Sequence, residues 1–204
     1  VWEVQHTAAT EQIVSDPAAT HKALLALLDS RGVPYKLTHH EEVRTSEEAA
    51  AIRGATLASG AKAMLLAKDT ESFVLIVLSA SEKLSWSKAR KLFGKKLNLA
   101  TEEQVVECTG CLPGTQAPVR SPVHMLANAV AIADVVHAPD RALPGSVPPF
   151  GRLFKGQVPT YCDHSLLRQG ETINFNCGLR TASIAMSVHD YLAVEEPTMI
   201  DVIQ

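Results

Sequence analysis

The sequence predicts a mixed α+β domain built around one curved β-sheet. Segments typical of helices and of strands are interspersed without strict βαβ alternation, and most links between strands are short. The chain has 204 residues, 46% hydrophobic and 20% charged, which is enough for one sizeable core. We expect a single domain over residues 18–195, with a poorly ordered lead-in over 1–17 and a tail or linker over 196–204.

The first elements are predicted from capping and proline signals. Asp16 followed by Pro17 is typical of a helix start, and Gly32 is typical of its end. The inward face of this helix should consist of Leu24, Leu25, Leu27 and Leu28. Residues 33–38 are then predicted to form a short edge strand, because edge strands tolerate a proline near their start.

A short helix and a hairpin follow. The Thr-Ser-Glu-Glu run at residues 45–48 is a capping box that opens a short helix, which Gly54 ends. Ala61–Lys68 and Ser72–Ser79 flank a turn and are predicted to pair as a hairpin. The second of these strands is apolar on both faces, which indicates a central position in the sheet.

Positive charge is concentrated in one turn–helix–turn segment. A helix is predicted over residues 85–93, and another, capped by Thr101, over the residues up to Glu107. The net charge of the chain is −3, so no global basic field indicates nucleic acid, and this segment is a local basic patch. Its members are Lys83, Lys88, Arg90, Lys91, Lys95 and Lys96.

Gly145–Gly151, with the sequence Gly-Ser-Val-Pro-Pro-Phe-Gly, is predicted to be a stiff loop. Its adjacent prolines remove two backbone donors and disfavour helix before them. The N–H groups of Gly145, Ser146 and Val147 have no regular ladder to join, so they could hold an anionic or carbonyl oxygen. The alternative is a tight surface turn in which Phe150 fills the core.

The remaining elements are short. We predict an apolar helix over residues 123–136, a strand over 158–162, a short helix over 163–168, strands over 172–176 and 180–186, and a last helix from Ser187.

Seven segments, in order from about residue 18 to 195, resemble the YbaK family of aminoacyl-tRNA deacylases, which are related to the editing domain of bacterial prolyl-tRNA synthetases. The segments are TSEEAA (45–50), GAKAMLL (60–66), LSW (84–86), TGCLPG (109–114), GSVPPFG (145–151), VPTYCD (158–163) and NCGLR (176–180). The resemblance implies a barrel-like mixed sheet surrounded by helices. It also implies hydrolysis of the ester that joins a wrong amino acid to tRNA, usually alanine or cysteine on proline tRNA.

The resemblance assigns catalysis to Lys62 and to the loop residues Gly145 and Ser146. Lys62 shares a strand face with Met64 and Leu66, so its stem lies on apolar surface while its ammonium needs a partner. The family lysine is placed to hold the terminal phosphate or the carbonyl region of the substrate. The alternative is a strand-end lysine that reaches into water.

Five further residues are predicted to bind substrate. They are His40, Thr45, Pro149, Asp163 and Gly178. His40 would line the amino-acid pocket, or else is a hydrogen-bonded loop histidine. Asp163 and Gly178 match family positions but are also the residue types that turns use.

The expected partner is the acceptor end of tRNA, bound by the basic patch through phosphates. An aminoacyl-tRNA synthetase, in cis or in trans, is a further expected partner. The alternative to a deacylase is a non-catalytic appendage that kept the fold and binds tRNA or protein. Residues 115–144 depart from the family pattern as an insertion, which leaves two candidates for the family's Gly-x-x-x-Pro loop, residues 114–118 and 145–149. The second is favoured because Phe150 and Gly151 continue the family pattern after it.

The cysteines give no strong signal for a metal or cofactor. Cys108 and Cys111 form one C-x-x-C pair, but no second pair of ligands follows at metal-binding spacing. We therefore predict buried free thiols, no metal and no cofactor; a cysteine-dependent redox protein is a third interpretation. Four cysteines without a secretory signal indicate a cytoplasmic protein, and no apolar run is long enough to cross a membrane.

Overall fold

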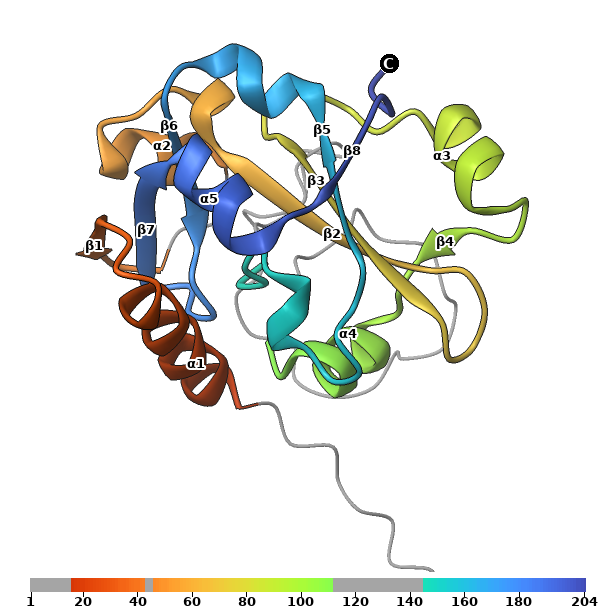
Figure 1. The fold of residues 1–204 in the computed structure, drawn as a ribbon, viewed down its shortest axis with the longest axis horizontal. Helices are drawn as coiled ribbons and strands as arrows, with labels where there is room; N and C mark the ends of the chain where they lie inside the picture. The colour runs from red at the N-terminus through yellow and green to blue at the C-terminus, as the bar shows by residue number, and fades with distance from the viewer. Residues whose placement is uncertain (1–15, 43–45, 112–144) are drawn as a thin grey trace, which may run out of the picture.

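The computed structural model describes residues 16–42, 46–111 and 145–204. Within these ranges the chain forms two β-sheets with helices packed around them (Figure 1). Residues 1–15 of the expected lead-in over 1–17, the helix over 123–136, the insertion over 115–144 and the capping residue Thr45 lie outside the described residues. Asp16 and Pro17, which belong to the expected lead-in, begin the first helix. No helix among the described residues is long and apolar enough to cross a membrane.

The larger sheet has the strand order β4-β2-β3-β5-β8. The predicted hairpin is confirmed as β2 (Ala61–Ala67) and β3 (Phe73–Ser79), which pair antiparallel with β3 in the centre. The edge strand β4 (Asn98–Leu99) pairs with β2. On the other side β5 (Thr160–Asp163) runs parallel to β3, and β8 (Thr198–Ile200) runs parallel to β5.

The smaller sheet is antiparallel with the order β1-β7-β6. Its strands are β1 (Tyr35–His39), β6 (Thr172–Asn176) and β7 (Ala182–Ser187). A single parallel bridge between Gly60 and Asn174 joins it to the start of β2. The fold class α+β is therefore confirmed, but the strands are divided between two sheets, and the described residues form no closed barrel.

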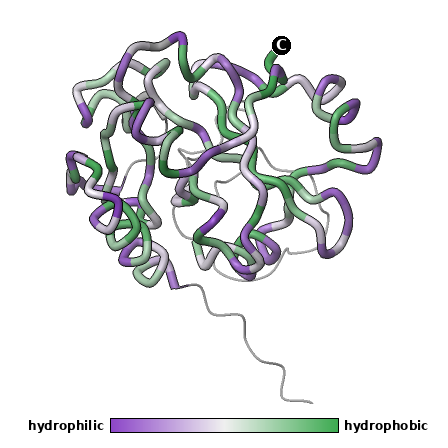
Figure 2. Tube along the Cα trace, viewed as in Figure 1, coloured by the Kyte–Doolittle hydropathy of each residue, from purple (hydrophilic) through white to green (hydrophobic). Residues whose placement is uncertain are grey.

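The core is also divided in two by the alternation of side chains in β2 and β3. Leu65, Leu75 and Val77 face a main core that the smaller sheet, Phe150 and Tyr191 complete. The neighbouring positions face a second core, which α3 (Trp86–Phe93) covers. Because β3 is buried on both faces, its sequence is a continuous apolar run, which is visible in Figure 2 as green along the central strands.

Two helices begin at residues whose side chains cap them as the sequence predicts. In α1 (Pro17–Ser30) the Asp16 carboxylate accepts a hydrogen bond of 2.9 Å from the Ala19 N–H, and Leu24 and Leu28 are fully buried. In α4 (Glu102–Thr109) Thr101 and Gln104 form a reciprocal capping box. The others are α2 (Ser46–Arg53), α5 (Val188–Glu195) and the short 3₁₀ helices η1 (Leu57–Ser59), η2 (Gly151–Leu153) and η3 (His164–Gln169).

Residues 196–204 differ from the expected tail or linker. They contain β8, which pairs with β5, and the segment then bonds to the turn before α3: the Ser85 N–H donates to the Val202 carbonyl. Val202 is fully buried and Ile203 is nearly so. The apolar residues near the end of this segment bury surface in the second core, and this makes the segment part of the domain.

Candidate active site

The smaller sheet presents a polar face toward α2. In each strand alternate residues point to opposite faces. Tyr35, Leu37, Ile173, Phe175 and Ile184 face the main core. The residues between them point to the other face. The polar residues on that face are Lys36, Thr38, Thr172, Asn174, Asn176 and Ser183.

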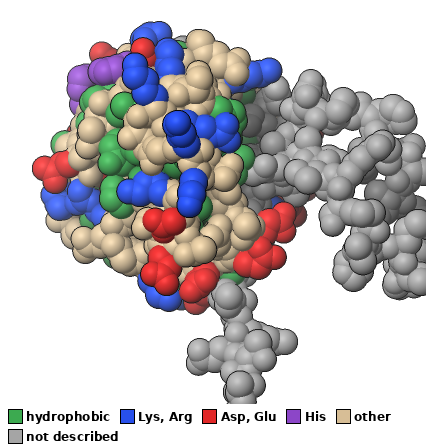
Figure 3. Space-filling view, turned by 90° about the vertical axis from the view of Figure 1, so that its right-hand side faces the viewer, with side chains coloured by type: hydrophobic (Ala, Val, Ile, Leu, Met, Phe, Trp, Pro, Cys, Tyr) green, Lys and Arg blue, Asp and Glu red, His purple; other side chains and the backbone are tan. Residues whose placement is uncertain are grey.

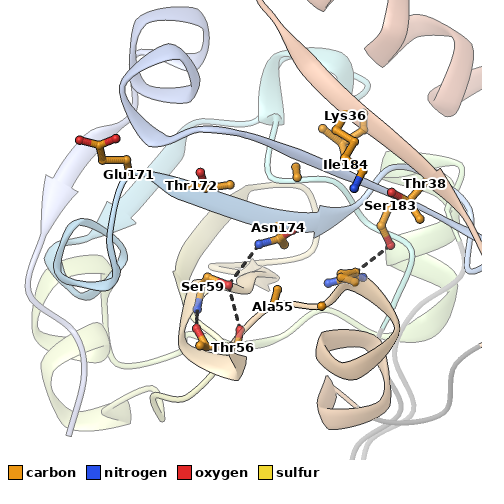
Figure 4. Close-up of a pocket in the computed structure, with 13 residues that line it drawn as sticks. Lys36, Thr38, Ala55, Thr56, Ser59, Glu171, Thr172, Asn174, Ser183 and Ile184 are labelled. Carbon is orange, nitrogen blue, oxygen red and sulfur yellow. Dashed lines mark hydrogen bonds between the residues drawn. The ribbon is translucent and has the colours of Figure 1, made fainter.

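This polar face forms the floor of a pocket of about 420 Å³ (Figure 4). The end of α2 and the residues that follow it, through Arg53, Thr56 and Ser59, form the opposite wall. The Asn174 side-chain amide donates to the Ser59 hydroxyl at 3.1 Å, which ties floor to wall next to the bridge between the sheets. The pocket therefore lies where the two sheets meet.

Arg53 lies in this pocket wall and is bound to two strands. Its Nε donates to the Ser183 hydroxyl at 2.9 Å, and its Nη2 donates to the Asn176 side-chain oxygen. Burial lowers the pKa of the half-buried Arg53 guanidinium, and the Cys177 thiol opposes this shift. Arg53 makes no ion pair with a carboxylate among the described residues, so no carboxylate of these residues neutralises its charge by direct contact.

His40 belongs to the same hydrogen-bond network. Its Nδ1 lies 2.7 Å from the Glu41 carbonyl oxygen, and its Nε2 lies 2.7 Å from the Ser183 hydroxyl oxygen. A carbonyl can only accept, so Nδ1 carries a hydrogen; in the neutral ring Nε2 then accepts from Ser183. The prediction that His40 binds substrate stays a prediction. Ser183, which accepts from Arg53, places His40 next to that residue.

The loop Gly145–Gly151 is held to this network by its carbonyl groups. The Asn176 side-chain amide donates to the Gly145 carbonyl at 2.6 Å, and the Gly178 N–H donates to the Ser146 carbonyl at 2.9 Å. Further along, the Tyr191 hydroxyl donates to the Pro149 carbonyl at 3.0 Å. The N–H groups of Gly145 and Val147, in contrast, donate to no other described residue. Residues 145–150 lie outside the helices and strands, as predicted, and Phe150 fills the core.

The far end of the loop is fixed by a buried ionic cluster. The Glu195 carboxylate accepts from the Gly151 N–H at 2.9 Å and from the Thr160 hydroxyl, and its other oxygen accepts from Arg152 Nε at 3.0 Å. A β-carbon at Gly151 would lie only 2.1 Å from the Val158 carbonyl oxygen, so only glycine fits there. The loop thus has a defined position at both ends.

Lys62 lies near this site but its side chain is directed elsewhere. It is two residues beyond the Gly60–Asn174 bridge, on the face of β2 that belongs to the second core. Its ammonium donates to the Glu82 carbonyl at 2.7 Å. Burial lowers the pKa of the half-buried ammonium; Glu82 opposes this, and Lys83 adds to it.

Asp163 shares that face of the larger sheet. Cys162 lies opposite Val77, so in these parallel strands Asp163 follows beside Leu78, which is the partner of Lys62. The buried carboxylate accepts from the N–H groups of Ser165 and Val202, each at 2.7 Å. It therefore caps η3 and anchors the C-terminal segment, as the alternative interpretation of Asp163 as a turn residue predicts. The predicted contact with substrate stays a prediction.

The two other predicted substrate residues are structurally constrained. Gly178 has φ of +93°, and a β-carbon there would approach the His21 nitrogen to 2.9 Å, so α1 packs directly on this turn. Pro149 is buried. A substrate contact through either of them remains a prediction.

The basic patch is exposed along α3 and the turns around it. Figure 3 shows Lys and Arg side chains gathered on this face of the molecule, which is the right-hand side of Figure 1. Lys88 pairs with Asp201 at 3.2 Å, and Arg90 lies 5.3 Å from the centre of the Trp86 ring. Trp86 and Phe93 pack toward the second core, as their spacing predicts.

The four cysteines are buried free thiols. Burial raises the pKa of Cys108 to about 11, of Cys162 to about 12 and of Cys177 to about 11. Thiols held protonated in this way are poor nucleophiles and poor metal ligands. The described residues contain no group of three or more His, Cys, Asp or Glu side chains that could hold a metal ion.

No motif in the sequence marks Arg53, Asn176 or Ser183 as site residues. The alternation Thr-Ile-Asn-Phe-Asn over residues 172–176 does contain a usable signal, because it places polar residues on one strand face and apolar residues on the other. Which face meets α2 depends on the packing of the two sheets. The sequence pattern alone could not pair these residues with Arg53.

Comparisons with known proteins agree with this architecture. Residues 40–141 match the family model of the aminoacyl-tRNA editing domain. The matched range includes most of the expected insertion over 115–144. The chain is 26% identical over 188 residues to the Multifunctional Ser/Thr-tRNA deacylase ProXp-y of Escherichia coli, covering 90% of this chain and 93% of the relative.

Two solved structures have a similar fold. One is a proposed trans-editing enzyme for prolyl-tRNA synthetase, at 22% identity and a TM-score of 0.66, covering 91% of this chain and 97% of that one. The other is a structure from work on epitope backbone grafting onto scaffold proteins, at 20% identity, the same TM-score and the same coverage. These likenesses support the fold.

Proposed function

The chain belongs to the aminoacyl-tRNA editing domain family, and from this premise we propose that it is an aminoacyl-tRNA deacylase. The observation that carries the proposal is the family match of residues 40–141, which are half of the chain. The substrate is a tRNA that bears a wrong amino acid on its terminal ribose. The products are the free amino acid and the uncharged tRNA.

Hydrolysis of this ester needs an attacking water and stabilisation of one developing negative charge. The water oxygen bonds to the carbonyl carbon, the bond from that carbon to the ribose oxygen breaks, and the ribose oxygen leaves with a proton. An activated ester needs little beyond positioning and oxyanion stabilisation. The N–H groups of Gly145 and Val147 support an oxyanion role for the loop, because other described residues do not use them.

Lys62 is the proposed catalytic lysine. Its half-buried ammonium, with a lowered pKa and a backbone carbonyl as hydrogen-bond partner, supports a role beyond surface solvation. A compact cation of this kind suits a phosphate or a developing oxyanion. We propose that it releases the Glu82 carbonyl when the acceptor end of tRNA binds.

Two substrate assignments are supported. The family resemblance favours alanine or cysteine on proline tRNA. The Escherichia coli relative, named a Ser/Thr-tRNA deacylase, favours serine or threonine. One missing methylene is worth only about 1–3 kcal/mol of discrimination in a hydrophobic pocket, so relative rates decide between these substrates better than a single activity does.

A deacylation panel tests the proposal. Wild-type chain and the Lys62→Ala variant would be given tRNA charged with alanine, cysteine, serine or threonine, and release of the amino acid would be measured. We expect turnover of at least one substrate by the wild type and its loss in the variant, with unchanged thermal unfolding. No turnover on any of them, with tRNA binding retained, would favour the non-catalytic appendage. Full turnover by Lys62→Ala would remove the lysine from the mechanism.

A further inference from the structure

The pocket beside Arg53 has features of an anion-recognition site. A guanidinium carries five N–H groups, of which Arg53 uses one on Nε and one on Nη2. The others have no partner among the described residues, and the side chain lines the pocket wall. Ser183 and Asn176 hold the planar group in one orientation. A fixed guanidinium with unused parallel donors suits a bidentate oxyanion such as phosphate.

The charges of the pocket are separated along its length. Lys36, the other basic residue of the lining, and Ser183, the partner of Arg53, lie toward the same end (Figure 4). Glu171 lies at the opposite end. The middle is lined by hydroxyl and amide groups of Thr56, Ser59 and Asn174. This pattern fits a ligand with an anionic group at one end and neutral hydrogen-bonding groups along the rest.

The phosphates are the only groups of that kind at an aminoacyl-tRNA end. The amino acid is esterified, so it has no carboxylate, and its ammonium would be repelled by Arg53 and Lys36. The phosphate of the terminal nucleotide is an anion, and its ribose and base carry neutral donors and acceptors. A volume of about 420 Å³ is also more than a small amino-acid side chain needs.

We propose that Arg53, assisted by Lys36, binds the phosphate of the terminal nucleotide of the tRNA in this pocket. The inference rests on the proposed function for the identity of the ligand. Asn176 accepts from Arg53 and donates to the Gly145 carbonyl, so a bound phosphate is one side chain away from the loop. Arg53 is thereby a positioning residue for the ester, and not a catalytic residue.

Binding of adenosine 5′-monophosphate and of adenosine to the full chain, measured by calorimetry, tests the inference. We expect the monophosphate to bind about tenfold or more tightly than adenosine, because charge-assisted hydrogen bonds are the strong ones. Arg53→Gln should reduce the affinity for the monophosphate to that for adenosine. Arg53→Lys should recover part of it, since it restores the charge without the fork. Arg31→Gln, on the exposed end of α1, is the matched control and should change nothing.

Several results would overturn the inference. These are equal affinity of the wild type for the two probes, no binding of either, and unchanged affinity in Arg53→Gln. Arg53-dependent binding of L-serine methyl ester, which like the substrate has no free carboxylate, in place of the monophosphate would assign the pocket to the amino acid. If Arg53→Gln fails to fold, Lys36→Gln replaces it, because Lys36 is exposed; it should weaken binding of the monophosphate and leave adenosine unchanged.

The binding measurement is independent of catalysis. If the chain hydrolyses none of the four esters but binds the monophosphate through Arg53, the nucleotide site stands and the deacylase proposal fails. If the chain is an active deacylase but does not bind the monophosphate, the deacylase proposal stands and the nucleotide site fails. With an active enzyme, Arg53→Gln should raise KM for charged tRNA more than it lowers kcat, as expected for uniform binding.

Discussion

At the scale of single residues, Gly151 shows how closely the loop is packed. A β-carbon there would lie 2.1 Å from the Val158 carbonyl oxygen and 2.5 Å from the Thr160 hydroxyl, so backbone must move to admit it. We expect Gly151→Ala to lower the free energy of unfolding by about 3 kcal/mol. It should also reduce deacylation, because the loop is displaced. Urea unfolding and the deacylation assay check this.

Gly156 provides the matched comparison. It has φ of +79°, and a β-carbon added there would meet nothing within 4 Å, so alanine would introduce only backbone strain. We expect Gly156→Ala to cost about 1 kcal/mol and to leave deacylation unchanged. Equal losses of activity in the two variants would contradict the idea that the position of the loop matters.

Glu195 gives a prediction for pH dependence. Burial raises the pKa of its carboxyl, although bonds from Thr160 and Arg152 oppose the shift. The folded protein therefore binds this proton more tightly than the unfolded chain does. The contribution of Glu195 to stability is fully present below the unfolded pKa of about 4.3 and is lost as pH rises through the folded pKa.

Glu195→Gln removes this titration and keeps a side-chain oxygen for the Gly151 N–H. We expect the stability of wild type relative to the variant to fall as pH rises from about 4 to about 7. Urea unfolding of both proteins over a pH series measures the difference. A difference that stays constant over this range, or that grows in favour of wild type, would show that the raised pKa is wrong.

At the scale of elements, the segment that contains β8 contributes to stability. Val202 is fully buried in the second core, and its N–H donates to Asp163. We expect Val202→Ala to lower the free energy of unfolding by about 1–3 kcal/mol through lost burial. Gln204→Ala, which changes an exposed side chain, is the control and should change it little. Equal stability of the two variants would show that this segment does not stabilise the domain.

The basic patch around α3 predicts salt-dependent tRNA binding. Lys91 and Lys95 are exposed and make no ion pair with a described residue, so their charges are available to phosphates. We expect Lys91→Gln/Lys95→Gln to weaken tRNA binding and to reduce its salt slope by about 1–2. Filter binding over a range of salt concentrations measures both quantities.

A charge-matched pair on α1 separates local contact from net charge. Lys22→Gln/Arg31→Gln removes the same charge from the opposite side of the molecule, which is the left-hand side of Figure 1. We expect it to leave the salt slope unchanged. If both pairs reduce the slope equally, the effect belongs to net charge, and α3 is not the contact surface.

At the scale of the whole molecule, most helices and strands followed from local patterns. Asp16, Thr101 and Ser187 each cap the helix that the sequence predicts, because capping is decided within a few residues. The β2–β3 hairpin followed from the short turn between its strands, and the central position of β3 followed from apolar residues on both of its faces. The division into two sheets did not, since the pairing of strands distant in sequence is not encoded in local alternation.

The sequence by itself determined the fold class, the family resemblance, the loop at residues 145–150 and the basic patch, because each depends on residue types over a few neighbouring positions. Only the tertiary structure decided which polar residues meet. It joined Arg53 of α2 to Asn176 of β6 and Ser183 of β7, and it paired the Lys62 ammonium with the Glu82 carbonyl. The physical reason is that a side chain's neighbours across sheets are set by packing of the two cores, which involves residues more than a hundred positions apart.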